Sequence, residues 1–153
     1  MKKISSANLA VLSQQARQSP RLRANSNLHE ELGDPIQRLA IAMEPDTLML
    51  PHRHPHTWEV LTALRGRFTV LVFDNAGRVI ERAVLGEDSS VVEIPAGAWH
   101  AVLSRDTGAV IFEVKHGPYA PICEADIAAW SKGRSAAELN RWYAAAQIGD
   151  EID

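Results

Sequence analysis

The sequence predicts an all-β fold, a small barrel or sandwich of short strands with a short helix before it and further helices after it. Three observations favour this fold. Between residues 36 and 116, short runs of β-branched and apolar residues recur with turn-forming residues between them. The sequence Asp-Asn-Ala-Gly at 74–77 separates two of these runs, as expected for a β-hairpin. On both sides of this region, serines that can cap a helix precede stretches with helical spacing of apolar residues.

The N-terminal part is expected to hold one helix and one irregular segment. Residues 5–18 are expected to be helical, because a serine can cap them and Leu9, Leu12 and Ala16 fall on one face. The segment 20–35, rich in Arg, Asn and Gly, is expected to be irregular. The short apolar runs that follow predict strands at residues 36–43, 47–51, 58–65, 67–74, 78–85, 91–94, 99–104 and 109–115.

The C-terminal part, residues 124–148, is expected to hold two helices. They are predicted at 124–130 and 135–147, and Ser135 with Glu138 three residues later forms a capping box for the second. A chain of 153 residues suits one domain, so residues 1–153 are expected to fold together, with the strands of the barrel at 36–116.

Composition excludes several classes of function. With 46% apolar residues, 23% charged residues and a net charge of -3, the chain is expected to be globular and not to bind nucleic acid. The apolar runs are far shorter than the ~18 residues of a membrane span. The single cysteine, Cys123, excludes an intrachain disulfide and a zinc site with two cysteines. Because polar residues interrupt the basic N-terminus before an apolar segment forms, a cytoplasmic protein is expected.

A group of histidines points to metal chemistry. Three of the six histidines lie within residues 52–56. In a strand, His52 and His54 would share one face and could bind one ion. Glu59 follows beyond a turn, and the tight turn at 95–99 precedes His100. Three neutral imidazoles and one carboxylate suit a divalent metal with positions left open for water or substrate.

Other interpretations of these residues stay open. The three histidines could be ordinary buried or surface residues of a metal-free protein. Glu59 could bind the ion directly, contact a metal-bound water or accept a hydrogen bond from a histidine. His56 is expected at the rim, since Pro55 bends the chain. The ligand set suits one divalent transition metal, Fe, Mn, Ni, Zn or Cu, without selecting among them.

The spacing resembles a known family. His-x-His-x4-Glu-x6-Gly at 52–66, followed about 30 residues later by Pro-x-Gly-x2-His at 95–100, resembles the two motifs of the cupin superfamily. This resemblance implies a jelly-roll β-barrel and a metal held by the three histidines and the glutamate. Three positions depart from the motifs, at Asp46, Ser89 and Ser104, and affect turns rather than the ligands.

A narrower resemblance extends from about residue 5 to about residue 130. Its segments are similar to the WbuC-type cupin metalloproteins, a group associated with bacterial surface-polysaccharide gene clusters. Analogy with single-chain cupins also implies a homodimer. The matching segments are 19–25, 34–38, 51–55, 93–97 and 112–119.

Five residues are candidates for binding a small-molecule substrate. Trp58 and Trp99 flank expected ligands and could stack on a sugar or aromatic ring, although packing in the core is the commoner role. Arg23 and Asn25 belong to the polar run 21–29, which could reach the mouth of the barrel or form a solvated loop. Arg38 lies on an expected strand and is the fifth candidate.

Glu113 and Lys115 are the candidates for catalytic acid–base groups. They share strand parity, so both side chains face either the metal or the solvent. Facing inward, they would lie near the ion as an ion pair.

Two functions of different classes fit the pattern. The first is a metalloenzyme, an isomerase or an oxygenase-like enzyme, acting on a small polar molecule such as a sugar or nucleotide-sugar. The second is a non-catalytic module that binds or senses a metal or a small ligand. A purely structural metal is a third and less favoured interpretation. Convergence of Glu113, Lys115 and Arg38 on the metal would favour catalysis, and outward orientation would favour binding.

Overall fold

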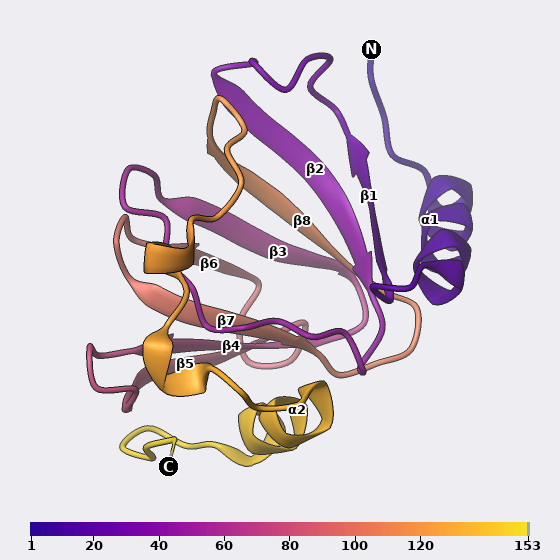
Figure 1. Ribbon diagram of the computed structural model, residues 1–153. Helices are drawn as coiled ribbons and strands as arrows, with labels where there is room; N and C mark the ends of the chain where they lie inside the picture. The colour runs from indigo at the N-terminus through magenta and orange to yellow at the C-terminus, as the bar shows by residue number, and fades with distance from the viewer. Residues whose placement is uncertain (153) are drawn as a thin grey trace.

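The computed structural model describes residues 1–152. Its strands form two antiparallel sheets, which face each other as a jelly-roll-like sandwich (Figure 1). The larger sheet has five strands in the order β1-β2-β8-β3-β6, and the smaller has three in the order β5-β4-β7. The strands are β1 (Arg23–Asn27), β2 (Ile36–Met43), β3 (Glu59–Arg65), β4 (Phe68–Phe73), β5 (Val79–Leu85), β6 (Val91–Ile94), β7 (Trp99–Ser104) and β8 (Ala109–His116). The helices are α1 (Ser6–Gln18) and α2 (Ala136–Ala145), and the short 3-10 helices are η1 (Glu124–Asp126) and η2 (Ala129–Ser131).

Alternation along the strands separates an inner face from an outer face. In β2, Met43 packs into the core between the sheets, whereas its neighbour Ala42 packs against α1. In β8, Ile111 points inward and Val110 points outward in the same way. The buried residues of the core between the sheets are Met43, Leu61, Phe68, Val70, Leu85, Ile94, Val102, Ala109 and Ile111.

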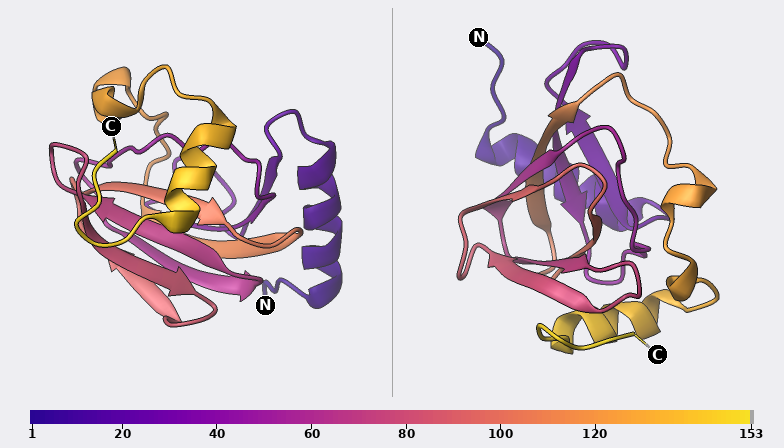
Figure 2. Two further views of the ribbon diagram at one scale, coloured as in Figure 1. Left: turned by 90° about the horizontal axis from the view of Figure 1, so that it is seen from below. Right: turned by 90° about the vertical axis from the view of Figure 1, so that its left-hand side faces the viewer.

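Each helix covers the outer face of a different sheet (Figure 2). Leu12 and Ala16 of α1 pack on the larger sheet, where the small side chain of Ala40 lets the helix approach closely. Leu139 and Tyr143 of α2 pack on the smaller sheet. Burial of these apolar faces, at about 25 cal/mol per Å², provides most of the stability of such short helices.

The structure confirms the all-β fold and most of the expected elements. The N-terminal helix is capped by Ser5, whose hydroxyl accepts the Asn8 backbone N–H. The capping box of Ser135 and Glu138 is present at α2. The resemblance implied a jelly-roll barrel, and the structure is a jelly-roll-like sandwich rather than a closed barrel, because strand pairing among residues 1–152 stays within each of the two sheets.

The segment 47–51 is not a strand, contrary to the expectation. Helix α2 satisfies part of its backbone instead of a neighbouring strand. Asn140 Nδ2 donates to the Thr47 carbonyl at 3.1 Å, and the Tyr143 hydroxyl donates to the Met49 carbonyl at 2.9 Å. The apolar residues that suggested a strand are thus held by tertiary contacts.

The prediction of an irregular segment at 20–35 missed strand β1. Its sequence Arg-Ala-Asn-Ser-Asn lacks the β-branched and aromatic residues that favour strands. β1 lies at the edge of the larger sheet and pairs with β2 alone. Pairing with a long apolar strand therefore outweighs a weak local preference.

The helix predicted at 124–130 is two short 3-10 helices. The chain between them pairs with the segment before β3, since the Ala128 N–H donates to the Pro51 carbonyl and Ile127 forms a β-bridge with His52. This pairing interrupts the helix.

Within the described residues, no helix is long and apolar enough to cross a membrane.

Gly66 provides a test of the packing at the turn between β3 and β4. Its φ is 70°, and a Cβ there would lie 2.8 Å from the Ala109 Cβ. Gly66→Ala is expected to lower the free energy of unfolding by about 3 kcal/mol, because it adds overlap with the core to backbone strain. Gly133 has a φ of 83° with nothing within 4 Å of the added carbon. Gly133→Ala should therefore cost about 1 kcal/mol, from strain alone. Urea denaturation measures both losses, and equal losses would contradict the role of the Ala109 contact.

Candidate metal centre and cavity

Backbone hydrogen bonds hold the three histidines of the candidate centre. The His52 N–H donates to the His100 carbonyl at 3.0 Å, and the His100 N–H donates to the His52 carbonyl at 2.8 Å. The Gly97 N–H donates to the His54 carbonyl at 2.8 Å. The segment that carries His52 and His54 is thus fixed to β7 and to the turn before it, although the segment is not a strand.

Hydrogen bonds to carbonyl groups orient two of the imidazole rings. His52 Nδ1 lies 2.9 Å from the Leu50 carbonyl oxygen, and His100 Nδ1 lies 3.0 Å from the Ala98 carbonyl oxygen. These contacts place a proton on Nδ1 of both rings, so that Nε2 is the ring atom that faces the centre. Carbonyl groups commonly orient metal-binding histidines in this way.

The donor atoms of the three histidines converge. The potential ligand atoms of His52, His54 and His100 all lie within 4.8 Å of one another. Glu59, the first residue of β3, turns its carboxylate to the same point, with 2.9 Å from Oε1 to His54 Nε2 and 3.1 Å from Oε2 to His100 Nε2. Three imidazoles and a carboxylate at these separations fit a divalent ion with bonds of ~2.1 Å.

Burial keeps the centre ready for a cation. Burial lowers the pKa of His52 to about 3, so that its ring is neutral at neutral pH. Burial opposes ionisation of Glu59, which is 4% exposed. Hydrogen bonds from His100 and His54 and the charge of Lys115 outweigh it and hold the pKa of Glu59 well below its usual range.

A cluster of charged side chains adjoins the histidines. Lys115 Nζ lies 3.0 Å from Glu59 Oε1 and 2.9 Å from Glu113 Oε1. Burial raises the pKa of Glu113, and the charge of Glu59 raises it further. For Lys115, burial is outweighed by the two carboxylates, which raise its pKa. Both side chains of β8 point inward because they share the parity of Ile111 in the core.

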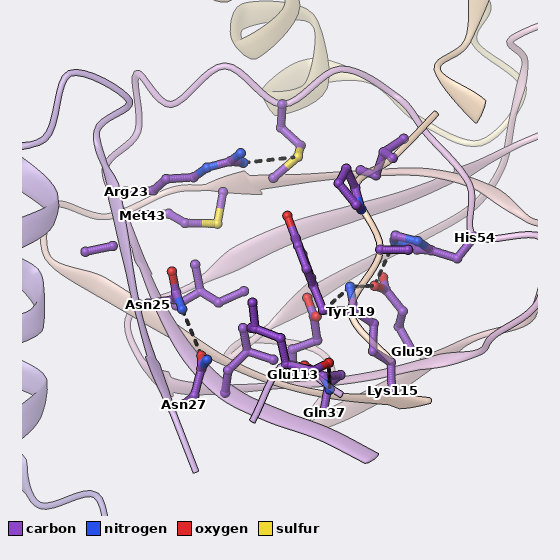
Figure 3. A pocket seen from close by; sticks show the side chains of 18 of the residues that line it. Arg23, Asn25, Asn27, Gln37, Met43, His54, Glu59, Glu113, Lys115 and Tyr119 are labelled. Carbon is purple, nitrogen blue, oxygen red and sulfur yellow. Dashed lines mark hydrogen bonds and ion pairs between the residues drawn. The ribbon is translucent and has the colours of Figure 1, made fainter. Parts of the chain in front are cut away.

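A cavity of about 700 Å³ lies beside this cluster, against the inner face of the larger sheet (Figure 3). His52, His54 and Glu59 line one end. The other walls come from the inward side chains of β1, β2 and β8, from Met49, and from residues 119–122. The cavity can therefore admit a small molecule that also contacts the histidine cluster.

Two of the five candidates for substrate binding line this cavity. Arg23 and Asn25 are inward residues of β1, and the polar run 21–29 also contributes Arg21, Asn27 and His29.

Arg38, Trp58 and Trp99 lie outside the cavity because of their parity. Arg38 pairs with Asp34 at 3.2 Å, on the outer side of β2. Trp58 packs on His116, with ring centroids 4.9 Å apart. Trp99 joins the core under α2, where the Arg53 guanidinium lies 4.5 Å from its ring centroid.

Several residues of the cavity wall were not predicted from the sequence. Gln37 and Met43 share the inward parity of β2, so alternation along that strand was an available signal. Tyr119 comes from an irregular segment, and no local pattern marks it. The exposed His56 is not part of the histidine cluster and lines, together with His54, a second cavity of about 360 Å³.

Comparison with known folds supports the architecture. KdgF from Halomonas sp. has a TM-score of 0.52 at 12% identity, over 67% of this chain and 84% of that one. TT1209 from Thermus thermophilus has a TM-score of 0.56 at 23% identity, over 76% of this chain and 97% of that one. An oxalate oxidase in complex with glycolate has a TM-score of 0.53 at 17% identity, over 69% of this chain and 56% of that one. At these identities the likeness shows the fold alone, and that fold is the cupin fold.

Sequence comparison gives the family. No curated protein matches the chain. The model of a domain of unknown function, DUF6016, matches residues 4–85, which is more than half of the chain. The chain therefore belongs to the DUF6016 family and has the cupin fold.

Proposed function

We propose that this protein is a metalloenzyme that holds one divalent transition metal with His52, His54, His100 and Glu59. The observation that carries the proposal is the convergence of three imidazoles and one carboxylate at the end of a cavity. The other charged groups beside the cluster, Glu113 and Lys115, favour catalysis over simple binding.

A bound metal would supply Lewis-acid or redox chemistry at the end of the cavity, as in an isomerase or an oxygenase-like enzyme. The residues beside the metal would position the charged groups and exchange a proton with the substrate. Lys115 bridges the carboxylates of Glu59 and Glu113 and holds them in place. Glu113, whose pKa is raised, is the group suited to exchange a proton with a substrate in the cavity.

The substrate that we propose is a small polar molecule, a sugar or nucleotide-sugar. Polar side chains from β1 and β2 along the cavity support this assignment. The resemblance of residues 5–130 to WbuC-type cupins supports a place in surface-polysaccharide synthesis. We propose a homodimer on the same analogy.

Metal analysis tests the centre directly. Untagged wild-type protein, purified without added metal or chelator, is expected to hold about one equivalent of a transition metal. His54→Ala should lose it, because it removes one of three imidazole ligands. His56→Ala is the matched control and should keep it, since the exposed His56 lies outside the cluster. Wild-type protein that neither contains metal nor takes it up on titration would refute the centre.

Removal of the buried lysine tests the charge cluster. Lys115→Met is expected to lower the free energy of unfolding of the metal-free protein by about 3 kcal/mol, because it removes the cation that contacts both the buried Glu59 and the partly buried Glu113. Adding Glu113→Gln should recover part of this loss. Lys132→Met is the control, since its partner Glu124 is exposed, and should change stability little. Urea denaturation of the four proteins gives the comparison, and equal effects of the two lysine substitutions would contradict the argument.

Turnover separates an enzyme from a binding module. Metal-loaded protein is incubated with sugars and nucleotide-sugars, and products are followed by NMR. Conversion that is lost in Glu113→Gln, with metal content unchanged, would support the enzyme. Ligands that bind tightly and are recovered unchanged would support the binding module.

A further inference from the structure

The guanidinium group of Arg23 lies in the cavity without an acidic partner. Among residues 1–152, no carboxylate lies within ion-pair distance of it, and its side-chain contact is Met49 Sδ at 3.9 Å. In Figure 3 a dashed line joins the end of the Arg23 side chain to this sulfur. A thioether is a weak acceptor and leaves most of the five N–H donors of the group free.

A second cation makes this end of the cavity more positive. Arg21, which also lines the cavity, has no carboxylate partner among the described residues. Burial lowers the pKa of Arg23, and the charge of Arg21 lowers it further, while Tyr119 and the charge of Glu113, beyond ion-pair distance, offset only part of this lowering. The Arg23 guanidinium is partly buried, so leaving it without an anion is costly, whereas Arg21 is exposed and adds positive charge beside it. Guanidinium groups bind carboxylate and phosphate in a planar, two-pronged geometry.

The inward face of β1 continues from these arginines with polar groups. Asn25 Nδ2 donates to Asn27 Oδ1 at 2.8 Å, which leaves the Asn25 oxygen and the Asn27 amide for other partners. Beyond them, His29 Nδ1 accepts the Arg38 backbone N–H at 3.0 Å, so the proton of the neutral ring is on Nε2. That Nε2 is buried and has no hydrogen-bond partner in the described structure. The wall thus carries amides that suit hydroxyl groups, beside a buried ring nitrogen whose hydrogen-bonding capacity is unused.

The net charge of the side chains that line the whole cavity is also positive. Three cationic side chains, Arg21, Arg23 and Lys115, line the cavity with two carboxylates, Glu59 and Glu113. Lys115 is engaged by both carboxylates, whereas the arginines are not. The cavity is therefore net positive in a chain whose net charge is -3, before any divalent ion is counted.

We propose that Arg23, assisted by Arg21, binds an oxyanion of the ligand, a phosphate or a carboxylate, while the hydroxyl-bearing part of the ligand lies along β1. The ligand class is thus an anionic polyhydroxylated molecule, such as a sugar phosphate or a sugar acid. The oxyanion site stands on the arginines alone. The further step, that the other end of the ligand reaches the histidine cluster, rests on the proposed function.

Three probes with a common ring test the site. Glucose, glucuronate and glucose 1-phosphate are titrated calorimetrically into protein stripped of metal by a chelator that is then removed by desalting. At least one anionic probe is expected to bind about tenfold or more tightly than glucose, since charge-assisted bonds to guanidinium are strong. The probe that binds tighter distinguishes phosphate from carboxylate. Anionic probes that bind no better than glucose would overturn the proposal.

Arginine variants locate the binding. Arg23→Met should weaken binding of the anionic probe about tenfold or more. Arg23→Lys should weaken binding less, because lysine keeps the charge but lacks the planar guanidinium group. Arg38→Gln is the matched control and should bind like wild type, since Arg38 lies outside the cavity and pairs with Asp34. Thermal unfolding shows whether each variant is folded. An Arg23→Met protein that is folded and binds as tightly as wild type would overturn the proposal.

The failure of this proposal differs from a failure of the metal centre. The titrations use metal-free protein, so their result does not depend on whether the histidine cluster binds a metal. Loss of selectivity for anions with normal metal content would overturn the oxyanion site alone. Absence of metal with selectivity retained would overturn the proposed metalloenzyme alone.

Discussion

The buried carboxylate of Glu59 is the constraint on which the candidate centre depends. An ionised carboxylate withdrawn from water costs several kcal/mol unless neighbouring groups compensate it. Here His54, His100 and Lys115 surround it, all within about 3.1 Å. Lys115 is itself partly buried and is balanced by Glu113. The inner face of β8 is therefore charged at this end. Lys115 compensates the charge of Glu59, Glu113 compensates the charge of Lys115, and all three side chains line the cavity.

The alternation of inward and outward side chains along the strands places residues both in the core and on the wall of the cavity. Along β2 and β8, the inward positions change from apolar to polar as the strands pass from the core to the cavity. Met43, which pairs with Ala109, packs into the core and borders the cavity, whereas Gln37 pairs with Lys115 at the far end. Both side chains of the second pair line the cavity. The same face of the sheet thus contributes to the apolar core and to the polar part of the cavity wall, and the close packing of the core keeps that wall rigid.

Strand parity explains what could be predicted from the sequence and what could not. The short apolar runs sufficed to predict an all-β fold, and the turn at 95–99 together with the motif spacing predicted the convergence of His100 with the other histidines. Parity also accounts for Trp99, which points to α2 because His100 beside it points inward. The strand β1 could not be predicted, because its polar residues pair through the backbone of β2 and face the cavity. The segment 47–51 is irregular because side chains of α2, far away in the sequence, bond its carbonyl groups. Both depend on distant partners that local patterns do not contain.

The position of the unpaired arginines is consistent with a division between stability and function. Arg23 lies on the edge strand, which is hydrogen-bonded to a neighbour on one side only, away from the core residues Phe68 and Leu85. An uncompensated charge there lowers stability without disturbing the packing between the sheets. Had stability alone shaped this face, an acidic residue at Asn25 or Asn27 could have approached the guanidinium from the same strand face. Neutral amides at both positions leave the positive charge available to a ligand. Unfavourable features such as an unpaired charge are expected at binding sites, and favourable interactions in the rest of the fold offset the stability that is lost there.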